Sequence, residues 1–143
     1  KRVSPKEVDD FILGFTIAND VSNRHAQFKD KQWGRGKSYD TFCPLGPVID
    51  TEVDGDHLDI MCRVDGKVMQ HSNTSDLLFS VRQLVSYISE CMTLLPGTII
   101  LTGTPGGVGF TRTPPAYLRE GQIVECEIEK IGILKNPVVR EKA

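Results

Sequence analysis

Short hydrophobic runs separated by polar turns make up most of this chain and predict a structure rich in strands. Residues 13–21 form an apolar run with little alternation, which is typical of a buried strand. The runs at 58–64 and 67–70 flank Asp65 and Gly66. This residue pair favours the positive φ angles of a tight two-residue turn, so the pattern predicts a β-hairpin.

Later in the chain, residues 98–101 form an apolar run that predicts a buried strand leading into a glycine-rich loop at 102–109. Residues 123–128 alternate between apolar and polar side chains, which predicts a further strand. Gly132 is expected in a turn, after which Ile133 and Leu134 are expected to pair back.

Two segments carry helix signals. Ser4, Pro5 and Glu7 fit the N-cap, first and third positions of a short helix that runs to Phe11. Ser80 is the expected N-cap of a longer helix, whose apolar side chains recur at helical spacing and predict a buried face: Val81, Leu84, Val85, Ile88, Cys91 and Met92. Residues 22–47 are expected to be loop and turn, with a helical turn near 24–27. The pattern as a whole predicts an α+β fold with two short helices.

Composition narrows the class of protein. The chain has 143 residues, enough for one domain with a real core, and its 39% hydrophobic and 25% charged residues are ordinary for a globular protein. The net charge is −2 without a basic cluster, which argues against nucleic-acid binding, and no apolar run approaches the length of a membrane span. We therefore expect neither a nucleic acid nor a membrane as a partner.

The beginning of the chain, Lys-Arg-Val-Ser-Pro, is neither a signal peptide nor a transit peptide, and it lacks an initiator Met. We expect residues 1–143 to be a single domain without its N-terminal portion. A cytoplasmic protein is expected, or a mitochondrial one if the parent carries a transit peptide. The four cysteines form no C-x-x-C pair and are predicted to be reduced thiols, mostly in the core: Cys43, Cys62, Cys91 and Cys126.

Residues 14–47 concentrate the candidate chemistry. A strand-like run ends at Asp20, and Arg24 and Gln27 follow within seven residues. Lys37 comes after two nearby glycines, which permit close approach of the backbone, and Thr41 lies just behind it. An acid, two cations and an amide on short irregular backbone are costly to place unless they surround an anion or a metal. This segment is therefore predicted to form one side of an active site.

These pieces resemble the C-terminal catalytic domain of the fumarylacetoacetate hydrolase family, and within it the fumarylacetoacetate hydrolase domain-containing proteins. The resemblance covers nearly the whole chain and rests on an ordered series: G-F-T-I-A-N-D-V-S at 14–22, R-x-x-Q at 24–27, Q-W-x-x-G-K-S-Y-D-T-F-C-P-L-G-P at 32–47, N-T at 73–74 and L-T-G-T-P-x-G-V-G at 101–109. It implies a β-rich mixed sheet, a roll or barrel, and a homodimer.

The resemblance also implies roles for single residues. Asp20 corresponds to a ligand of a divalent metal, magnesium in most relatives, with manganese or calcium as alternatives. Lys37 corresponds to the lysine that stabilises an oxyanion, Gln27 to the glutamine that assists it, and Arg24 to an arginine that orients the site or the substrate carboxylate.

Two further threonines are implied. Thr41 stands where the family has a site threonine. Thr104, with Gly103 beside it, corresponds to the loop that contacts the substrate carboxylate.

The sequence departs from the family pattern at its acidic residues and at His25. The E-x-E pair of metal ligands is expected upstream of residue 1. Glu125 and Glu127 also form an E-x-E, but they lie at the other end of the chain and are interpreted as a solvated strand face. His25 replaces a common aspartate and is not assigned as the general base.

The residue types suit a β-dicarbonyl acid, since a metal can polarise its carbonyl group and preorganised donors can stabilise the enolate. The resemblance implies a metal-dependent hydrolase or decarboxylase that cleaves a C–C bond in a 2-oxo acid such as an acylpyruvate or oxaloacetate. An isomerase of a 2-hydroxydienedioate from aromatic catabolism stays open, as does an inactive fragment or small dicarboxylate-binding module. We expect the 143-residue fragment alone to be inactive and a longer parent to be active.

Overall fold

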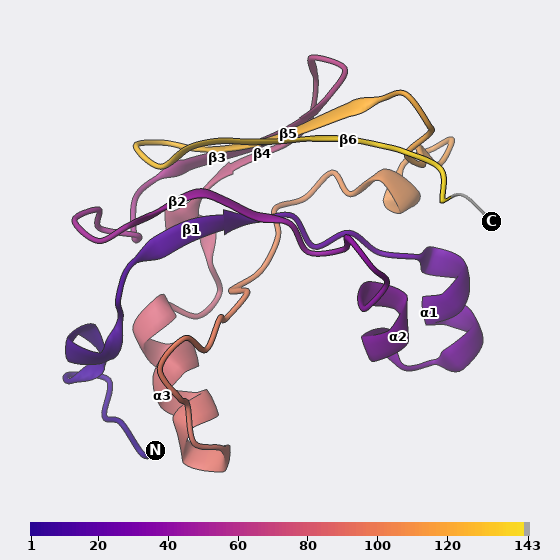
Figure 1. Cartoon of the computed structure of the whole chain (residues 1–143). Helices are drawn as coiled ribbons and strands as arrows, with labels where there is room; N and C mark the ends of the chain where they lie inside the picture. Colours follow the sequence, from indigo (N-terminus) through magenta and orange to yellow (C-terminus); the bar gives the residue numbers. More distant parts are fainter. Residues whose placement is uncertain (142–143) are drawn as a thin grey trace.

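The computed structural model describes residues 1–141 and has two antiparallel sheets. One sheet pairs β1 (Phe15–Ala18) with β2 (Leu45–Asp50). The other has the order β4-β3-β5-β6 and contains β3 (Asp59–Val64), β4 (Lys67–Asn73), β5 (Ile123–Ile128) and β6 (Gly132–Pro137). Figure 1 shows the smaller sheet beneath the larger one.

Helices lie at the margins of the sheets. In chain order they are the short 3-10 helix η1 (Val8–Phe11), α1 (Arg24–Asp30), α2 (Trp33–Lys37), η2 (Thr74–Asp76), α3 (Val81–Cys91) and η3 (Gly109–Thr111). The pair α1 and α2 follows the end of β1, whereas α3 lies apart from that pair, below the sheets (Figure 1).

The strand predictions succeed where the sequence contains a clear turn. Asp65 and Gly66 have φ angles of 51° and 76° and join β3 to β4 as expected. Residues 123–128 form β5, and the turn before Gly132 returns the chain as β6, with Cys126 opposite Leu134. Because the turn residues determine which strands meet, these hairpins could be inferred locally.

Two small cores hold the elements together. Ile17 of β1 packs with Leu58, Ile131 and Leu134 between the two sheets. A second cluster joins Val8 of η1 to two valines of α3. The first cluster packs Ile17, one residue before the end of β1, against Leu134 of the larger sheet, and the second holds η1 against α3.

Helix α3 begins where the sequence predicts and buries Val81 and Val85 of the expected face, but that face ends earlier than expected and two serines are buried beside it. The Ser80 side chain accepts a hydrogen bond from the Gln83 backbone N–H, and the side chain of Gln83 accepts from the Ser80 N–H, which together form a capping box. Ser86 and Ser89 are buried, whereas Cys91 and Met92 are exposed.

The N-terminal segment causes this difference in α3. The Ser86 hydroxyl donates to the Val3 carbonyl at 2.7 Å, and the Val3 N–H donates to Ser89 Oγ at 2.9 Å. The small polar side chains are therefore covered by backbone that lies 83 or more residues away in the sequence.

Several expectations are corrected. The predicted helix from Ser4 to Phe11 is only the short 3-10 helix η1. Residues 98–101 form no strand, and Ile99 and Leu101 are 55% and 43% exposed.

Both α1 and α2 form where mainly loop was expected, so the described residues contain three α-helices instead of two. The α+β class is confirmed, but within residues 1–141 the sheets are antiparallel instead of mixed and do not close into a barrel.

All four cysteines are free thiols, three of them half-buried. Cys62 and Cys126 are direct cross-strand neighbours on β3 and β5. Their mutual hydrogen bond lowers the pKa of Cys62, and the same bond, together with burial, raises the pKa of Cys126. None of the helices in residues 1–141 is long and apolar enough to cross a bilayer.

The chain exposes an unusually large surface for its size. Its accessible area is 10184 Å², and its mass is 15.9 kDa. A self-contained folded protein of that mass exposes about 7,400 Å². The excess of roughly 2,800 Å² includes large apolar side chains, among them Val48 and Ile49 of β2 and Leu78, which is 94% exposed.

Candidate active site

Asp20 and Lys37 form an ion pair at the end of β1. Asp20 lies two residues beyond the strand, Lys37 is the last residue of α2, and its Nζ donates to Asp20 Oδ2. The two side chains are 35% and 29% exposed, so the pair remains open to a ligand from solvent. The Lys37 ammonium also lies 5.6 Å from the ring centroid of Trp33.

The glycine before Lys37 allows α2 to pack tightly on α1. A Cβ added at Gly36 would lie 3.0 Å from Gln27 Cβ and 3.2 Å from the Asn23 carbonyl oxygen. A backbone hydrogen bond also joins the two segments, because the Asn23 N–H donates to the Gly36 carbonyl at 2.7 Å. The predicted close approach is confirmed at Gly36, whereas Gly34 has open space around it.

Arg24 and Gln27 form the second pair of the site. Both belong to α1, and Arg24 Nη1 donates to Gln27 Oε1 at 2.7 Å. Gln27 is only 3% exposed, so its amide is held inside the α1–α2 packing. Because a guanidinium can only donate, this contact fixes the amide with Oε1 toward Arg24 and leaves Nε2 as the available donor.

Thr104 lies in the glycine-rich loop, which rests on β4. Gln70 Nε2 donates to Thr104 Oγ1 at 2.9 Å and to the Pro105 carbonyl at 2.7 Å. Thr104 and Gly103 are both exposed, and Gly103 has a φ of 146° that favours glycine. Thr41 is exposed too, in a turn with a φ of 65°.

Phe110, the residue that follows the glycine-rich loop, contacts two side chains of α1. The Arg24 guanidinium carbon lies 4.2 Å from the ring centroid of Phe110, and the rings of Phe28 and Phe110 are 5.8 Å apart. The structure therefore joins Asp20 to Lys37, Arg24 to Gln27, and Phe110 to Arg24. The Thr104 side chain itself is hydrogen-bonded to Gln70 of β4.

Sequence reasoning missed Phe110 and Gln70. Phe110 follows directly on the glycine-rich loop, which is the only signal it gives. Gln70 lies inside a hairpin strand, where a polar residue is ordinarily assigned to a solvated face. Its contact with Thr104 is made across 34 residues and depends on how the loop folds back.

The described residues do not form a complete metal site of the kind that the family resemblance implies. Mg²⁺ prefers an octahedron of oxygen ligands, and Asp20 is the carboxylate that pairs with Lys37 in the candidate site. Among residues 1–141 there is no group of three or more His, Cys, Asp or Glu arranged to hold a metal. The donor set of these residues does not by itself fit the ion.

Glu125 and Glu127 take part in other contacts, in agreement with their interpretation as a strand face. Glu125 pairs with Lys135 at 3.1 Å and Glu127 with Arg63 at 2.6 Å, both across the larger sheet.

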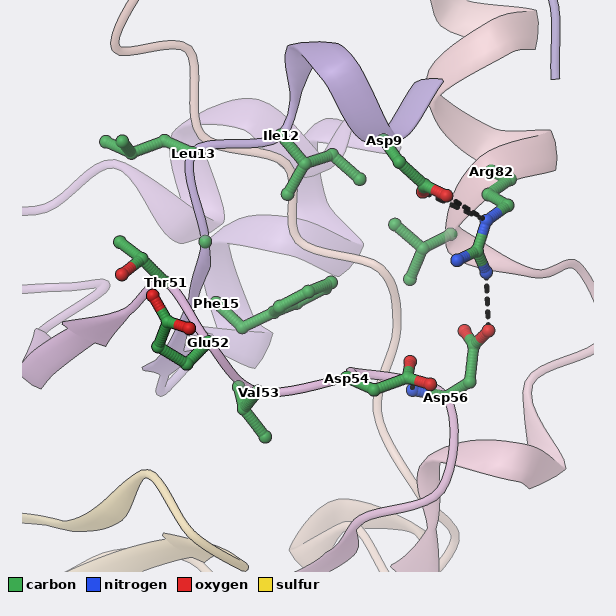
Figure 2. A pocket seen from close by; sticks show the side chains of 12 residues that line it. Asp9, Ile12, Leu13, Phe15, Thr51, Glu52, Val53, Asp54, Asp56 and Arg82 are labelled. Carbon is green, nitrogen blue, oxygen red and sulfur yellow. Dashed lines mark hydrogen bonds and ion pairs between the residues drawn. The ribbon is translucent and has the colours of Figure 1, made fainter. Parts of the chain in front are cut away.

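Two cavities lie elsewhere on the molecule. One of about 240 Å³ lies between η1, the 51–56 loop and the start of α3, where Arg82 is bound by Asp9 and Asp56 at 2.9 and 2.5 Å. Figure 2 shows the Arg82 guanidinium directed between these two carboxylates. A second cavity of about 560 Å³ lies beside Met69 and Arg112. Asp20, Lys37 and Thr104 line neither of them.

Residues 1–139 match the family described as fumarylacetoacetate (FAA) hydrolase, C-terminal. The chain belongs to the fumarylacetoacetate hydrolase family. The resemblance seen in the sequence motifs is thereby confirmed, including the branch of domain-containing proteins.

Three relatives illustrate the match. The chain is 47% identical to the mitochondrial oxaloacetate tautomerase Fahd2a of Rattus norvegicus over 97% of its own length and 46% of the relative's. It superposes on the 5-carboxymethyl-2-hydroxymuconate delta-isomerase of Mycobacterium smegmatis with a TM-score of 0.92 and 49% identity, covering 100% of this chain and 54% of that one. A fumarylacetoacetate hydrolase of Exiguobacterium antarcticum gives a TM-score of 0.96 at 39% identity, with 99% and 52% covered.

The chain thus spans about half the length of the relatives it matches.

Proposed function

We propose that the protein forms and stabilises the enolate of a 2-oxo acid, with oxaloacetate as the first substrate to test. The observation that supports this is the Asp20–Lys37 pair. It holds an ammonium group, partly open to solvent, at the end of a core strand. An enolate carries its negative charge on oxygen, and a fixed ammonium beside that oxygen stabilises the charge as it develops.

An enolate of a 2-oxo acid occurs in each of the candidate reactions. In tautomerisation a proton leaves C3 of oxaloacetate and a proton is delivered to the C2 oxygen. In decarboxylation the bond to the C4 carboxylate breaks, and its electron pair passes into the enolate of pyruvate. Hydrolysis of an acylpyruvate also releases that enolate. Lys37 would stabilise the oxygen in each case, and the available Nε2 of Gln27 would assist it.

Among these reactions we propose tautomerisation first, because a relative with 47% identity is named an oxaloacetate tautomerase. Cleavage of a C–C bond, by decarboxylation or acylpyruvate hydrolysis, is the second candidate, supported by the hydrolase among the solved relatives. Isomerisation of a 2-hydroxydienedioate is related proton-transfer chemistry, and the Mycobacterium smegmatis relative is named for a reaction of this type.

One assay separates the candidates in the full-length natural protein. Loss of the enol absorbance of oxaloacetate without release of pyruvate is expected for a tautomerase. Equal amounts of enol lost and pyruvate released would indicate a decarboxylase, and pyruvate from acetylpyruvate would indicate a hydrolase. Absence of turnover with oxaloacetate, acetylpyruvate and a 2-hydroxydienedioate would contradict the proposed function.

We further propose that Asp20 is one ligand of a divalent cation whose other carboxylates come from outside the described residues. Magnesium is the expected ion, with manganese or calcium as alternatives. Titration with Mn²⁺, followed by electron paramagnetic resonance, should give a tight site in the full-length protein. Asp20→Asn is expected to weaken it at least tenfold, since a hard cation loses a charged oxygen ligand. Equal Mn²⁺ affinity in both proteins would remove Asp20 from the ligand set.

A small 2-oxo acid is the proposed partner, and a homodimer is the proposed assembly. The mitochondrial relative of rat supports a mitochondrial location over a cytoplasmic one.

A further inference from the structure

The side-chain amide of Gln70 makes two hydrogen bonds from one nitrogen. Gln70 is half-buried on β4, and its Nε2 donates both to Thr104 Oγ1 at 2.9 Å and to the Pro105 carbonyl at 2.7 Å. Each bond lies within the normal range for N–H···O geometry. The amide thus spans the two residues at the centre of the glycine-rich loop.

The Pro105 contact determines which way the amide faces. A carbonyl oxygen can only accept, so the NH₂ group of Gln70 must face the loop, and the opposite orientation would place two oxygens together. Thr104 Oγ1 therefore accepts from Gln70. A hydroxyl has a single proton, and the proton of Thr104 is then directed away from Gln70, as a donor on an exposed side chain.

The loop is held on β4 at a second point. The Arg112 guanidinium donates to the Gly107 carbonyl at 3.0 Å and, through Nη2, to the Met69 carbonyl. Gly107 itself lies so close to β4 that an added Cβ would be 2.3 Å from the Met69 oxygen. The Pro105 carbonyl is thus bound directly to Gln70 of β4, and the Gly107 carbonyl is linked to Met69 of the same strand through Arg112.

A hydrogen-bond donor held in this way suits an acceptor that carries negative charge. Charge-assisted hydrogen bonds to a carboxylate are stronger than neutral ones, and preorganisation avoids the cost of orienting the donor when the ligand arrives. The Arg24 guanidinium contacts the ring of Phe110, the residue that follows this loop, and is a second positively charged group in the candidate site.

We propose that Gln70 is a positioning residue, which sets the Thr104 hydroxyl as a hydrogen-bond donor to the carboxylate of the 2-oxo acid. This inference rests on the proposed function for the identity of the ligand. According to this inference, Gln70 of β4 affects substrate affinity only through Thr104.

A double-mutant cycle in the full-length protein tests this role. Gln70→Leu keeps the side-chain volume but removes both bonds, and it should raise KM for oxaloacetate roughly tenfold with little change in kcat, because a single charge-assisted contact is weakened. Thr104→Val should raise KM by a similar factor. If Gln70 acts through Thr104, Gln70→Leu in the Thr104→Val background should raise KM less than twofold further.

Gln70→Glu gives a sharper contrast. A carboxylate at this position would accept the Thr104 proton, oppose the Pro105 carbonyl and repel an anionic substrate. Its KM should exceed that of Gln70→Leu, although its shape is closer to glutamine. The matched control is Gln122→Leu, which removes an amide that bridges Asp65 and the Arg119 N–H at the start of β5. The control should leave KM unchanged.

The proposal would be overturned if Gln70→Leu raised KM by the same factor in the wild-type and Thr104→Val backgrounds. An unchanged KM in Gln70→Glu would also overturn it. A separate readout applies if the protein turns over none of the substrates. Amide hydrogen exchange in residues 103–108 should be at least tenfold faster in Gln70→Leu and unchanged in Gln122→Leu. Unchanged exchange in Gln70→Leu would then reject the positioning role, independently of the proposed function.

Discussion

At the scale of single residues, Lys37 is the side chain on which the proposed chemistry depends most. Its ammonium is held by Asp20 and is partly exposed, so Lys37→Ala should reduce kcat by roughly two or more orders of magnitude, as expected when an oxyanion donor is removed. Steady-state kinetics of the full-length protein measure this. The urea midpoint should change little, because a partly exposed ion pair contributes on the order of 1 kcal/mol or less to stability. A near-normal kcat would exclude Lys37 from the mechanism.

At the scale of elements, the glycine-rich loop depends on its contact with β4. Gly107 has a φ of 98°, and a Cβ there would meet the Met69 carbonyl, whereas Gly106 has nothing within 4 Å of the added atom. Gly107→Ala should therefore displace the loop and lower the free energy of unfolding by about 2 kcal/mol or more. It should also raise KM at least as much as Gln70→Leu.

Gly106→Ala is the matched control for this element, since it adds the same methyl group one residue away. Urea denaturation should show a change of less than about 0.5 kcal/mol for Gly106→Ala. Equal stability and equal KM in the two variants would show that the loop does not require its close approach to β4.

At the scale of the whole molecule, the exposed surface is the dominant feature. The excess of roughly 2,800 Å² over a self-contained protein is more than a standard interface buries, and part of it is apolar side chains on β2. We expect the isolated 143-residue chain to associate non-specifically and to lack turnover, because residues 1–141 do not by themselves complete the metal site proposed above. The full-length protein should sediment as a single dimeric species and be active. Robust turnover by a monodisperse 143-residue chain would contradict this expectation.

Much of the architecture could be predicted because it depends on local signals. Asp65 and Gly66 specify one hairpin, Ser80 specifies the start of α3, and the alternation at 123–128 specifies β5. The motifs around Asp20 and Lys37 pointed to the family, and the structure brings these two residues together.

Other features depended on contacts that no local pattern encodes. Residues 98–101 are apolar, yet they form no strand in the described chain, since strand formation requires a partner as well as a suitable sequence. The serines of α3 are buried because the backbone near Val3 satisfies their hydroxyls. The family resemblance implies site roles for Asp20, Lys37 and Thr104, but the contacts of the described residues join only Asp20 to Lys37, while Thr104 is bound to Gln70.

The sequence by itself determined the turns, the helix cap, the family and the residue types of the candidate site, because each of these depends on neighbours within a few positions or on an ordered series of motifs. Only the tertiary structure decided that Gln70 holds Thr104 and that Phe110 meets Arg24. Those contacts join residues 34 and 86 positions apart. Contacts between residues so far apart in the sequence depend on how the sheets pack and how the loop folds back. The identity of either residue alone does not reveal them.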